Sequence, residues 1–293
     1  MTHEGEDPCP QMKICRTIEE MHVARQSERG ESKRFGLVPT MGALHEGHLS
    51  LVRAAKAQCQ VVAVSLFINP LQFGPNEDLA NYPRNFERDR EILEREKIDL
   101  LFAPSAEEMY PPGAVTYVSV EGLSEKLCGR SRPGHFRGVT TVVSKLFNIV
   151  EPAVAFFGQK DAAQAAIIRR MVRDLNTPVQ IVTCPIVREQ DGLAMSSRNA
   201  YLDQKERKSA LVLYRSLRDI QRQFDQGEGS AAKLIKAGKR IFAEAPAVRL
   251  DYFEIVDPET LDPVDPVSPG ALAAVAAFVG GARLIDNIVL GRS

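Results

Sequence analysis

The sequence has few cysteines and no pattern that would pair them. Its 293 residues include five, an odd and scattered set without a Cys-x-x-Cys pair: Cys9, Cys15, Cys59, Cys128 and Cys184. This spacing argues against a disulfide framework and against a cysteine zinc site. Reduced thiols are typical of cytoplasmic proteins, so a cytoplasmic location is expected.

Long apolar runs and an excess of basic charge are also missing. No stretch of about 18 uncharged apolar residues occurs, so neither a membrane span nor a membrane partner is expected. The 37 basic and 38 acidic residues give a net charge of -1, which argues against a nucleic-acid partner. Residues 1–13 are polar and lack the apolar core of a signal peptide. We predict that they form a flexible N-terminal extension.

The chain does have 44% hydrophobic residues, and they fall into alternating patterns. Apolar β-type runs alternate with amphipathic patterns up to about residue 188, which predicts a parallel sheet with right-handed crossovers. We therefore expect an α/β fold with a Rossmann-like domain over 14–188. The strands are predicted at 35–40, 61–69, 99–105, 153–158 and 179–188, and the helices at 48–59, 86–97, 138–150 and 162–175.

The pattern changes after residue 188. A long helix is predicted over 204–224 and a second over 231–245. Short apolar runs at 248–257, 272–280 and 282–290 predict strands joined by hairpins. Residues 189–293 are therefore expected to form a smaller α+β C-terminal domain.

Two of the five histidines stand close together after the first predicted strand. His45 and His48 are spaced i, i+3 and share a face at the start of a helix. Ligands bind at this edge of an open α/β sheet, and a helix N-terminus favours phosphate. Gly42 and Gly47 allow close backbone approach, and imidazole N–H groups can donate to phosphate oxygens. Surface or capping histidines are the alternative, while a metal site lacks a third ligand.

A second polar segment follows the strand predicted at 153–158. Lys160 can place a point charge on a phosphate. Asp161 could accept from a ribose hydroxyl, and Gln164, one helical turn further, could bind a hydroxyl or a carboxylate. The alternative is an ordinary helix N-terminus that Asp161 caps.

A third polar segment, Gly-Leu-Ala-Met-Ser-Ser-Arg-Asn, begins at residue 192. Ser196, Ser197 and Arg198 offer two hydroxyls and a guanidinium fork, which suit the oxygens of a triphosphate. A solvated linker at a domain boundary is the alternative. Such a linker is also where a mobile lid would lie.

Two loops add weaker candidates. Gln72 and Tyr82 lie in a long polar stretch, 68–84, and could line a pocket. A locally basic segment, 129–141, leads to a helix N-terminus that could face an anion. Its charged side chains are Arg130, Arg132, His135 and Arg137. An ordinary surface loop is the default interpretation of that segment.

Five segments together resemble the pantoate–β-alanine ligase family. They are PTMGALHEGH, INPLQFGPNEDLANYPR, GRSRPGHFRGV, FFGQKD and MSSRN, in the family's order and spread over nearly the whole chain. The resemblance implies a Rossmann-like fold of the nucleotidylyltransferase type. It also implies an enzyme that condenses pantoate with β-alanine through a pantoyl adenylate, using ATP and Mg²⁺ and releasing AMP and pyrophosphate, in pantothenate and coenzyme A biosynthesis. A homodimer is implied as well.

The resemblance assigns residues to each part of the site. ATP would be bound by Met41, Gly42, Ala43, Leu44, His45, Glu46, Gly47, His48, Gly158, Gln159, Lys160, Asp161, Val187, Met195, Ser196, Ser197 and Arg198. The catalytic group would be His48, Lys160, Ser196, Ser197 and Arg198, with His48 assigned to acid catalysis. Gln72 and Gln164 would hold pantoate, Gln72 would also lie near β-alanine, and Asp89 would be near the magnesium ion.

One segment departs from the family's pattern. Members commonly carry Lys-Asp-aromatic-Gln-Gln, whereas this chain has Ala162 and Ala163 between Lys160-Asp161 and Gln164. The change predicts different packing around the pantoate pocket rather than different chemistry. One alternative function is an adenylyltransferase that acts on a phosphate acceptor, which would share the histidine pair but does not call for the pair Gln72 and Gln164. The other is a non-catalytic nucleotide sensor, against which the intact His48, Lys160 and Arg198 count.

Overall fold

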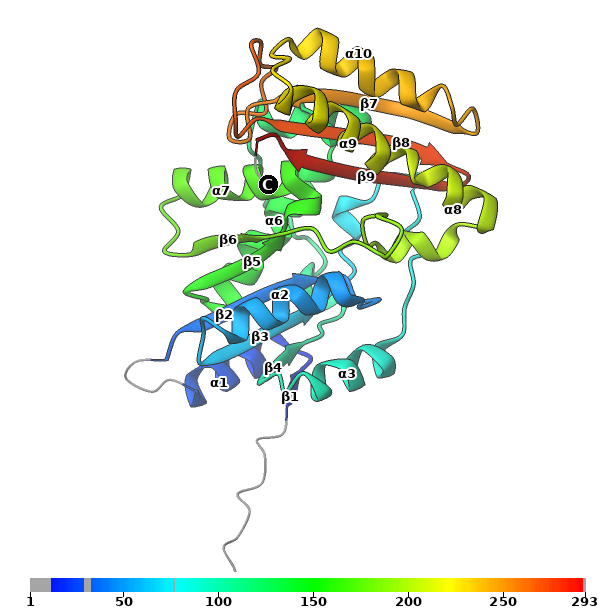
Figure 1. Ribbon diagram of the computed structural model, residues 1–293. Helices are drawn as coiled ribbons and strands as arrows, with labels where there is room; N and C mark the ends of the chain where they lie inside the picture. Colours follow the sequence, from blue (N-terminus) through cyan, green and yellow to red (C-terminus); the bar gives the residue numbers. More distant parts are fainter. Residues whose placement is uncertain (1–11, 29–32, 76, 292–293) are drawn as a thin grey trace, which may run out of the picture.

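The computed structural model describes residues 12–28, 33–75 and 77–291. Within these ranges the chain forms a parallel sheet of six strands and an antiparallel sheet of three (Figure 1). The parallel strands lie in the order β1–β4–β3–β2–β5–β6. Their bounds are Lys13–Cys15, Leu100–Phe102, Val61–Leu66, Phe35–Thr40, Val154–Gly158 and Gln180–Cys184, in that order across the sheet. The predicted α/β class with a Rossmann-like parallel sheet is confirmed.

Helices connect these strands and cover both faces of the sheet (Figure 1). The longer ones are α1 (Ile18–Ser27), α2 (Glu46–Lys56), α3 (Phe86–Arg95), α6 (His135–Val150) and α7 (Ala162–Asp174). Two single turns, α4 (Ala106–Met109) and α5 (Cys128–Ser131), precede α6. All adjacent strands of this sheet run parallel, as a chain of strand–helix–strand units requires.

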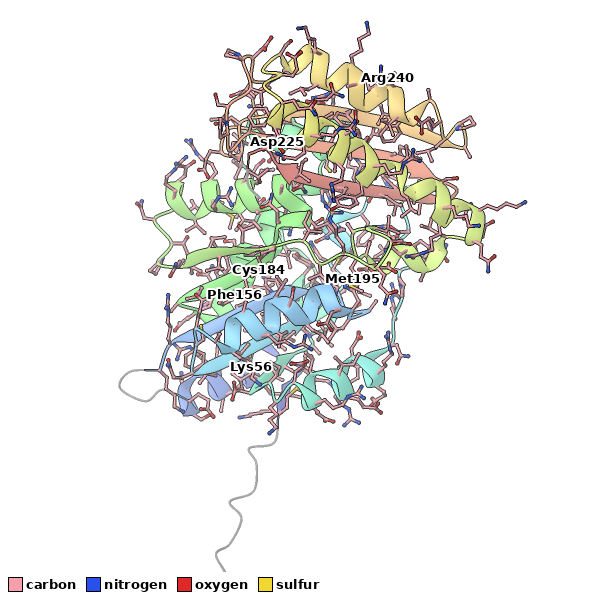
Figure 2. All side chains as sticks on the ribbon, in the orientation of Figure 1. Lys56, Phe156, Cys184, Met195, Asp225 and Arg240 are labelled. Carbon is pink, nitrogen blue, oxygen red and sulfur yellow. The ribbon has the colours of Figure 1, made fainter. Side chains whose placement is uncertain are left out.

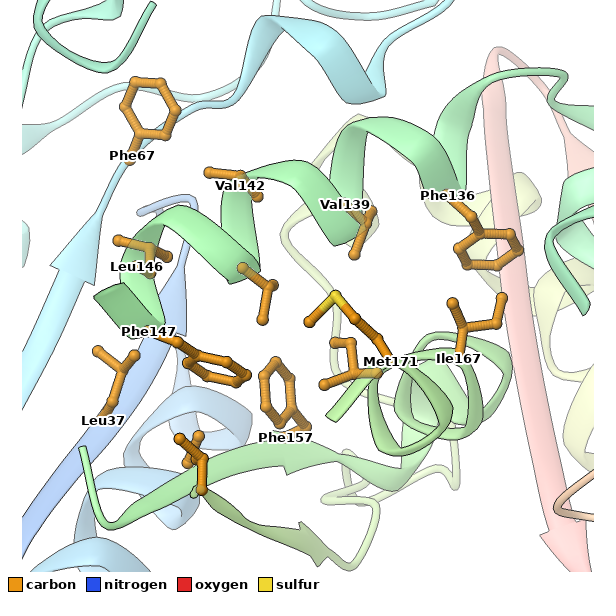
Figure 3. Packing of buried hydrophobic residues seen from close by; sticks show 14 of the residues in the cluster. Leu37, Phe67, Phe136, Val139, Val142, Leu146, Phe147, Phe157, Ile167 and Met171 are labelled. Atoms are coloured by element: carbon orange, nitrogen blue, oxygen red, sulfur yellow. The ribbon is translucent and has the colours of Figure 1, made fainter. Parts of the chain in front are cut away.

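The central strands are buried on both faces because their side chains alternate. Leu37 and Phe157 belong to the core that α6 and α7 cover, and Figure 3 shows both among the side chains of that core. Val38 and Phe156 belong to the core on the other face, with apolar residues of α2. A strand buried on both faces reads as a continuous apolar run, which explains why the sequence pattern located β2 and β5.

The order of strands reverses between β2 and β5. The chain adds β3 and then β4 on one side of β2, and β5 and then β6 on the other. Ligands of open α/β sheets bind at the carboxyl ends of the strands beside such a reversal. The segments 41–48 and 158–161 leave the carboxyl ends of β2 and β5, so the pairing of these strands brings the two segments together.

The smaller sheet lies over α6 and α7, which separate it from the parallel sheet (Figure 1). It contains β7 (Val248–Val256), β8 (Leu272–Val279) and β9 (Ala282–Val289) in that order, all antiparallel. Its helices are α8 (Gln204–Ala210), α9 (Val212–Asp225) and α10 (Ala231–Phe242). The core beneath α6 continues into this sheet through Tyr252 and Leu272, so the domain boundary near residue 188 stays a prediction.

One prediction about the elements was wrong, and one helix was missed. The long helix expected over 204–224 is divided into α8 and α9 at Leu211, which lies against the smaller core. No glycine or proline marks this division, so packing rather than local sequence decides it. Helix α1 was not predicted, although Thr17 and Glu20 form the capping box at its start, a signal that the sequence does contain.

The predicted N-terminal extension ends earlier than residue 13. Met12 is buried, and Lys13 begins β1, which pairs with β4 at the edge of the sheet. Residues 1–11 of that prediction lie outside the described residues. In the described part of the chain, no helix is both long enough and apolar enough to cross a membrane.

Candidate active site

A buried carboxylate fixes the backbone of the turn between β2 and α2. Asp89 of α3 is 2% exposed, and its two oxygens accept the backbone N–H groups of Ala43 at 2.7 Å and Leu44 at 2.9 Å. Gly42 has a φ of 82° and Ala43 a φ of 51°, so the chain turns sharply before the helix. Asp89 therefore acts as a structural support of this turn.

The expectation that Asp89 lies near a magnesium ion stays a prediction. Both of its oxygens are engaged by the turn, and Asp89 does not line the main cavity described below. In the described residues no group of three or more His, Cys, Asp or Glu side chains could hold a metal ion.

The two histidines stack at the start of α2 with defined hydrogen bonds. The Nδ1 atom of His45 accepts from the backbone N–H of Gly47 at 3.1 Å, and that of His48 accepts from the backbone N–H of His45 at 3.4 Å. The ring centroids are 4.1 Å apart. An Nδ1 that accepts a hydrogen bond leaves the proton of a neutral ring on Nε2. Each ring therefore carries its N–H donor at Nε2, on the side of the ring opposite Nδ1.

Burial keeps both rings uncharged. It is the largest cause that lowers the pKa of His45 to about 4 and that of His48 to about 3; the Lys160 ammonium contributes to both shifts, and His45 contributes to that of His48. A like charge and a desolvated site both disfavour the imidazolium form. Near neutral pH the pair is thus a set of neutral N–H donors.

Lys160 lies in the turn that follows β5. Its ammonium is 3.5 Å from the Asp161 carboxylate. The backbone of this turn is bound by Asn287 of β9, whose Nδ2 donates to the carbonyl oxygens of Gln159 at 2.9 Å and Lys160 at 3.0 Å. The Gln159 side chain donates back to Oδ1 of Asn287 at 2.9 Å. The smaller sheet therefore fixes the backbone that carries Lys160.

The Ser-Ser-Arg segment contacts the segment 78–82. Met195 donates its backbone N–H to the Val187 carbonyl at 3.0 Å, and Figure 2 shows Met195 between α2 and the smaller sheet. The hydroxyl of Ser197 is 3.1 Å from that of Tyr82. Arg198 makes two hydrogen bonds to the Asp78 carboxylate, at 3.0 and 2.9 Å. The segments 78–82 and 195–198 thus face each other.

The Gln72 amide is oriented by buried neighbours. Its Oε1 accepts from Nδ2 of Asn69 at 3.1 Å, and its Nε2 donates to the Met41 sulfur at 3.1 Å. Asn69 is 1% exposed, and its Oδ1 accepts from the Tyr110 hydroxyl at 2.9 Å. The backbone N–H of Leu71 donates to the same oxygen at 3.3 Å, and Nδ2 donates to the Gly138 carbonyl at 3.0 Å, which fixes the orientation of the Asn69 amide. Asn69 thereby sets the orientation of Gln72.

These segments surround one main cavity. The predicted site residues that line it are Met41, His45, Gly47, His48, Gln72, Gly158, Lys160, Asp161, Gln164, Val187, Met195, Ser196, Ser197 and Arg198. Those that do not line it are Gly42, Ala43, Leu44, Glu46, Gln159 and Asp89. Leu44 is buried in the core and Glu46 pairs with Arg53 on the surface of α2, while Gln159 faces Asn287. The structure therefore brings together residues that are up to about 150 positions apart.

Several lining residues were not assigned a role from the sequence. Arg132 and His135 belong to the basic segment before α6 and line the cavity, whereas Arg130 pairs with Glu254 at the surface. Asn69 and Thr40 line it as well. The sequence signal for Arg132 and His135 was the local excess of basic residues before a helix, which did not distinguish inward from outward side chains.

A second cavity adjoins the first at the departure from the family's pattern. Ala162 and Ala163 line it, together with Gln164, which also lines the main cavity. On the other side lie residues of the smaller sheet, among them Tyr252 and Arg283. Ala162 and Ala163 carry only methyl groups at the two positions where family members commonly have an aromatic ring and an amide, so they leave space in this cavity.

The fold and the site together define a class. A parallel sheet that presents two neutral imidazoles at a helix N-terminus, a lysine after β5 and a Ser-Ser-Arg segment in one cavity is typical of a nucleotide-binding α/β enzyme. The family described as Pantoate-beta-alanine ligase matches residues 13–289. The chain belongs to the pantoate–β-alanine ligase family, and its reaction is the ATP-dependent ligation of pantoate with β-alanine.

Individual relatives agree over nearly the full length. The chain is 59% identical to a pantothenate synthetase of Koribacter versatilis (strain Ellin345) over 279 residues, covering 95% of this chain and 96% of the relative. It is 59% identical over 280 residues to that of Thermotoga neapolitana, covering 96% and 100%.

Solved structures agree as well. Pantothenate synthetase from Thermus thermophilus superposes with a TM-score of 0.91 at 48% identity, covering 95% of this chain and 99% of that chain. Pantoate-beta-alanine ligase from Francisella tularensis, solved in complex with beta-gamma ATP and β-alanine, has a TM-score of 0.79 at 33% identity, covering 96% and 99%.

Proposed function

We propose that this chain makes pantothenate in two steps within the main cavity. The pantoate carboxylate attacks the α-phosphorus of ATP, which forms pantoyl adenylate and releases pyrophosphate. The β-alanine amine then attacks the pantoyl carbonyl carbon, which forms the amide bond and releases AMP. The observation that carries this proposal is that His48, Lys160 and Ser197 line the same cavity as Gln72 and Gln164.

The first step needs positioning and charge stabilisation rather than an enzyme nucleophile. Negative charge grows on the departing pyrophosphate, and Lys160 and Arg198 supply positive charge beside it. His45 and His48 donate from Nε2. Because the low pKa of His48 keeps its ring neutral, we propose that it acts by donating a hydrogen bond, in place of the acid catalysis expected from the resemblance.

Pantoate would lie at the side of the cavity formed by α6 and β5. Val142, Leu146 and Phe157 form an apolar wall there, which suits the two methyl groups of pantoate. Gln72 and Gln164 offer amides to its hydroxyl and carboxylate oxygens. The fixed orientation of Gln72 presents its Nε2 as a donor.

The described residues do not form a dedicated magnesium site. Asp161 is the one carboxylate among the residues that line the main cavity, and it lies beside Lys160. Mg²⁺ is commonly held by substrate phosphates and water with only one or two carboxylates. We propose that Mg²⁺ enters with ATP as part of the substrate and that Asp89 takes no part in its binding.

The surroundings of the site are also proposed. The smaller domain, 189–293, would shield the adenylate from water, because Ser197 and Arg198 already contact Tyr82 and Asp78. We propose a homodimer on the resemblance to the family, which sedimentation would test. A cytoplasmic location is proposed on the four described cysteines, all of which are free.

Mass spectrometry of the reaction without β-alanine tests the proposed order of steps. Pantoate and ATP alone should yield pyrophosphate and a pantoyl adenylate, and β-alanine should then release AMP. An AMP release that requires no pantoate, or an absence of adenylate under these conditions, would contradict the proposal.

A further inference from the structure

One arginine that lines the main cavity has no role in the first step of the proposed reaction. Arg132 lines both cavities, and its side chain is 15% exposed. Two neighbouring arginines point elsewhere. Arg130 is 61% exposed and pairs with Glu254, and Arg137 lies over the Tyr117 ring at 4.6 Å. Of the arginines in this segment, Arg132 alone faces the site.

The guanidinium of Arg132 is held in place by Gln72 and His135. Its Nη2 donates to the Gln72 backbone carbonyl at 3.2 Å, and its Nη1 lies 3.0 Å from Nε2 of His135. Nδ1 of His135 is 2.8 Å from the same carbonyl. A carbonyl only accepts, so His135 donates from Nδ1 and its Nε2 accepts from Arg132. The arginine is therefore preorganised beside the residue proposed to bind pantoate.

The outer edge of this guanidinium binds a carboxylate of the protein itself. Nε of Arg132 is 2.6 Å from Oε1 of Glu77, and Nη2 is 2.5 Å from Oε2. This is the two-point geometry with which arginine recognises a carboxylate. The contact comes from the loop that also sends Asp78 to Arg198. Glu77 thus shows how a carboxylate is seated on Arg132.

β-Alanine needs such a partner within reach of the pantoyl carbonyl. At neutral pH it carries a carboxylate two methylenes away from its amine. The cations of the main cavity are Lys160, Arg132 and Arg198, and the proposed reaction uses Lys160 and Arg198 for the triphosphate. We propose that Arg132 binds the carboxylate of β-alanine after Glu77 has left the guanidinium. This inference rests on the proposed two-step function.

A bidentate carboxylate site would also favour an amine substrate that carries a carboxylate. An amine without one cannot replace Glu77 on the guanidinium and gains no hydrogen bond there, so it should bind more weakly than β-alanine. The amine end of a substrate held at Arg132 would extend toward Gln72, because the guanidinium is bound to that residue's backbone.

Two assays on R132Q separate binding of the β-alanine carboxylate from a role in adenylate formation. The first measures pantoate-dependent exchange of pyrophosphate into ATP, and the second measures AMP release against β-alanine concentration. We expect exchange within about twofold of wild type and a KM for β-alanine raised roughly 10- to 100-fold, the range of a lost charged hydrogen bond. Retained exchange also shows that the variant is folded. R130Q is the matched control and should change neither assay.

A carboxylate-free amine gives the specificity readout. The kcat/KM for 3-aminopropanol should be the same in R132Q and wild type. The ratio of kcat/KM for β-alanine to that for 3-aminopropanol should therefore fall by the same factor as kcat/KM for β-alanine. E77Q removes the competing carboxylate and should lower the KM for β-alanine.

Three results would overturn the inference. They are an unchanged KM for β-alanine in R132Q, a loss of exchange as large as the loss of AMP release, and a raised KM in E77Q. The second would assign Arg132 to the phosphates of ATP. An absence of pantoate-dependent exchange in the wild-type enzyme would instead refute the proposed two-step function itself.

Discussion

The side-chain amide of Asn287 donates a hydrogen bond to the backbone carbonyl of Lys160, with 3.0 Å between the two atoms. Asn287 is 3% exposed and also binds Gln159 through two further hydrogen bonds. Next to it, Asp286 binds Arg188, at the start of the segment that leads to Ser196, at 2.7 and 2.9 Å. Strand β9 therefore supports two of the three segments of the site.

We predict that N287A slows formation of the adenylate by roughly 100-fold, because a displacement of about 1 Å in a charged group can cost that much. The KM for β-alanine should change little. Stopped-flow or quenched measurement of pyrophosphate release checks this, with N148A as a control. Asn148 binds Ser144 on the exposed side of α6, far from β9 in the fold. A normal rate in N287A would mean that Lys160 keeps its place without β9.

Removing a donor from the nucleotide side should slow the first step strongly. We expect K160A and H48A each to lose on the order of 100- to 1000-fold in pyrophosphate release, the usual cost of one preorganised donor. K233A is a suitable control, because Lys233 is 72% exposed on α10. Near wild-type turnover of either variant would remove that residue from the mechanism.

A distant tyrosine should affect pantoate binding. Y110F removes one of the two hydrogen bonds that Oδ1 of Asn69 accepts, and so weakens the support that Asn69 gives to the Gln72 amide. We predict a KM for pantoate raised roughly fivefold, corresponding to about 1 kcal/mol for one hydrogen bond. The KM for ATP should stay the same, since Tyr110 does not line the cavity. An equal rise in both constants would indicate general loosening of the site instead.

Stability should fall as the solution becomes acidic. Burial lowers the pKa of His45 to about 4, of His48 to about 3 and of His135 to about 4. In the unfolded chain these rings take up protons near pH 6.5, so between about pH 6.5 and 4 the unfolded state binds more protons. The free energy of unfolding should decrease by up to about 1.4 kcal/mol per pH unit for each ring.

Urea denaturation at pH 7, 6 and 5 measures this slope. H48Q should make the decrease less steep, because it removes one of the three rings. H22Q should leave the slope unchanged, since His22 lies on the exposed face of α1. A stability that rises on acidification would show that the buried rings are charged in the folded protein.

The same low pKa values predict the acid limit of the first step. The donors His45 and His48 stay neutral well below pH 6.5, so pyrophosphate release should show no acid limb near that pH. A fall in rate centred on pH 6.5 would mean that one of the rings titrates normally in the complex with ATP.

The sequence by itself determined the order of most strands and helices and the chemical character of the site. Runs such as Val61–Leu66 are apolar because both of their faces are buried, so their position follows from hydrophobic pattern alone. The histidine pair was found because glycine and polar residues follow directly after an apolar strand, and the Ser-Ser-Arg segment because its hydroxyls and guanidinium stand close together in the chain. These are local properties, and a local pattern is enough to reveal them.

Only the tertiary structure decided which side chains meet. The segments that carry His48, Lys160 and Ser197 converge because β2 and β5 pair across the reversal in strand order, and no local pattern encodes that pairing. Asp89 supports the turn at Ala43, and Arg132 faces inward while Arg130 faces water. Those outcomes depend on packing between distant residues, because burial and hydrogen-bond partners exist only once the chain has folded.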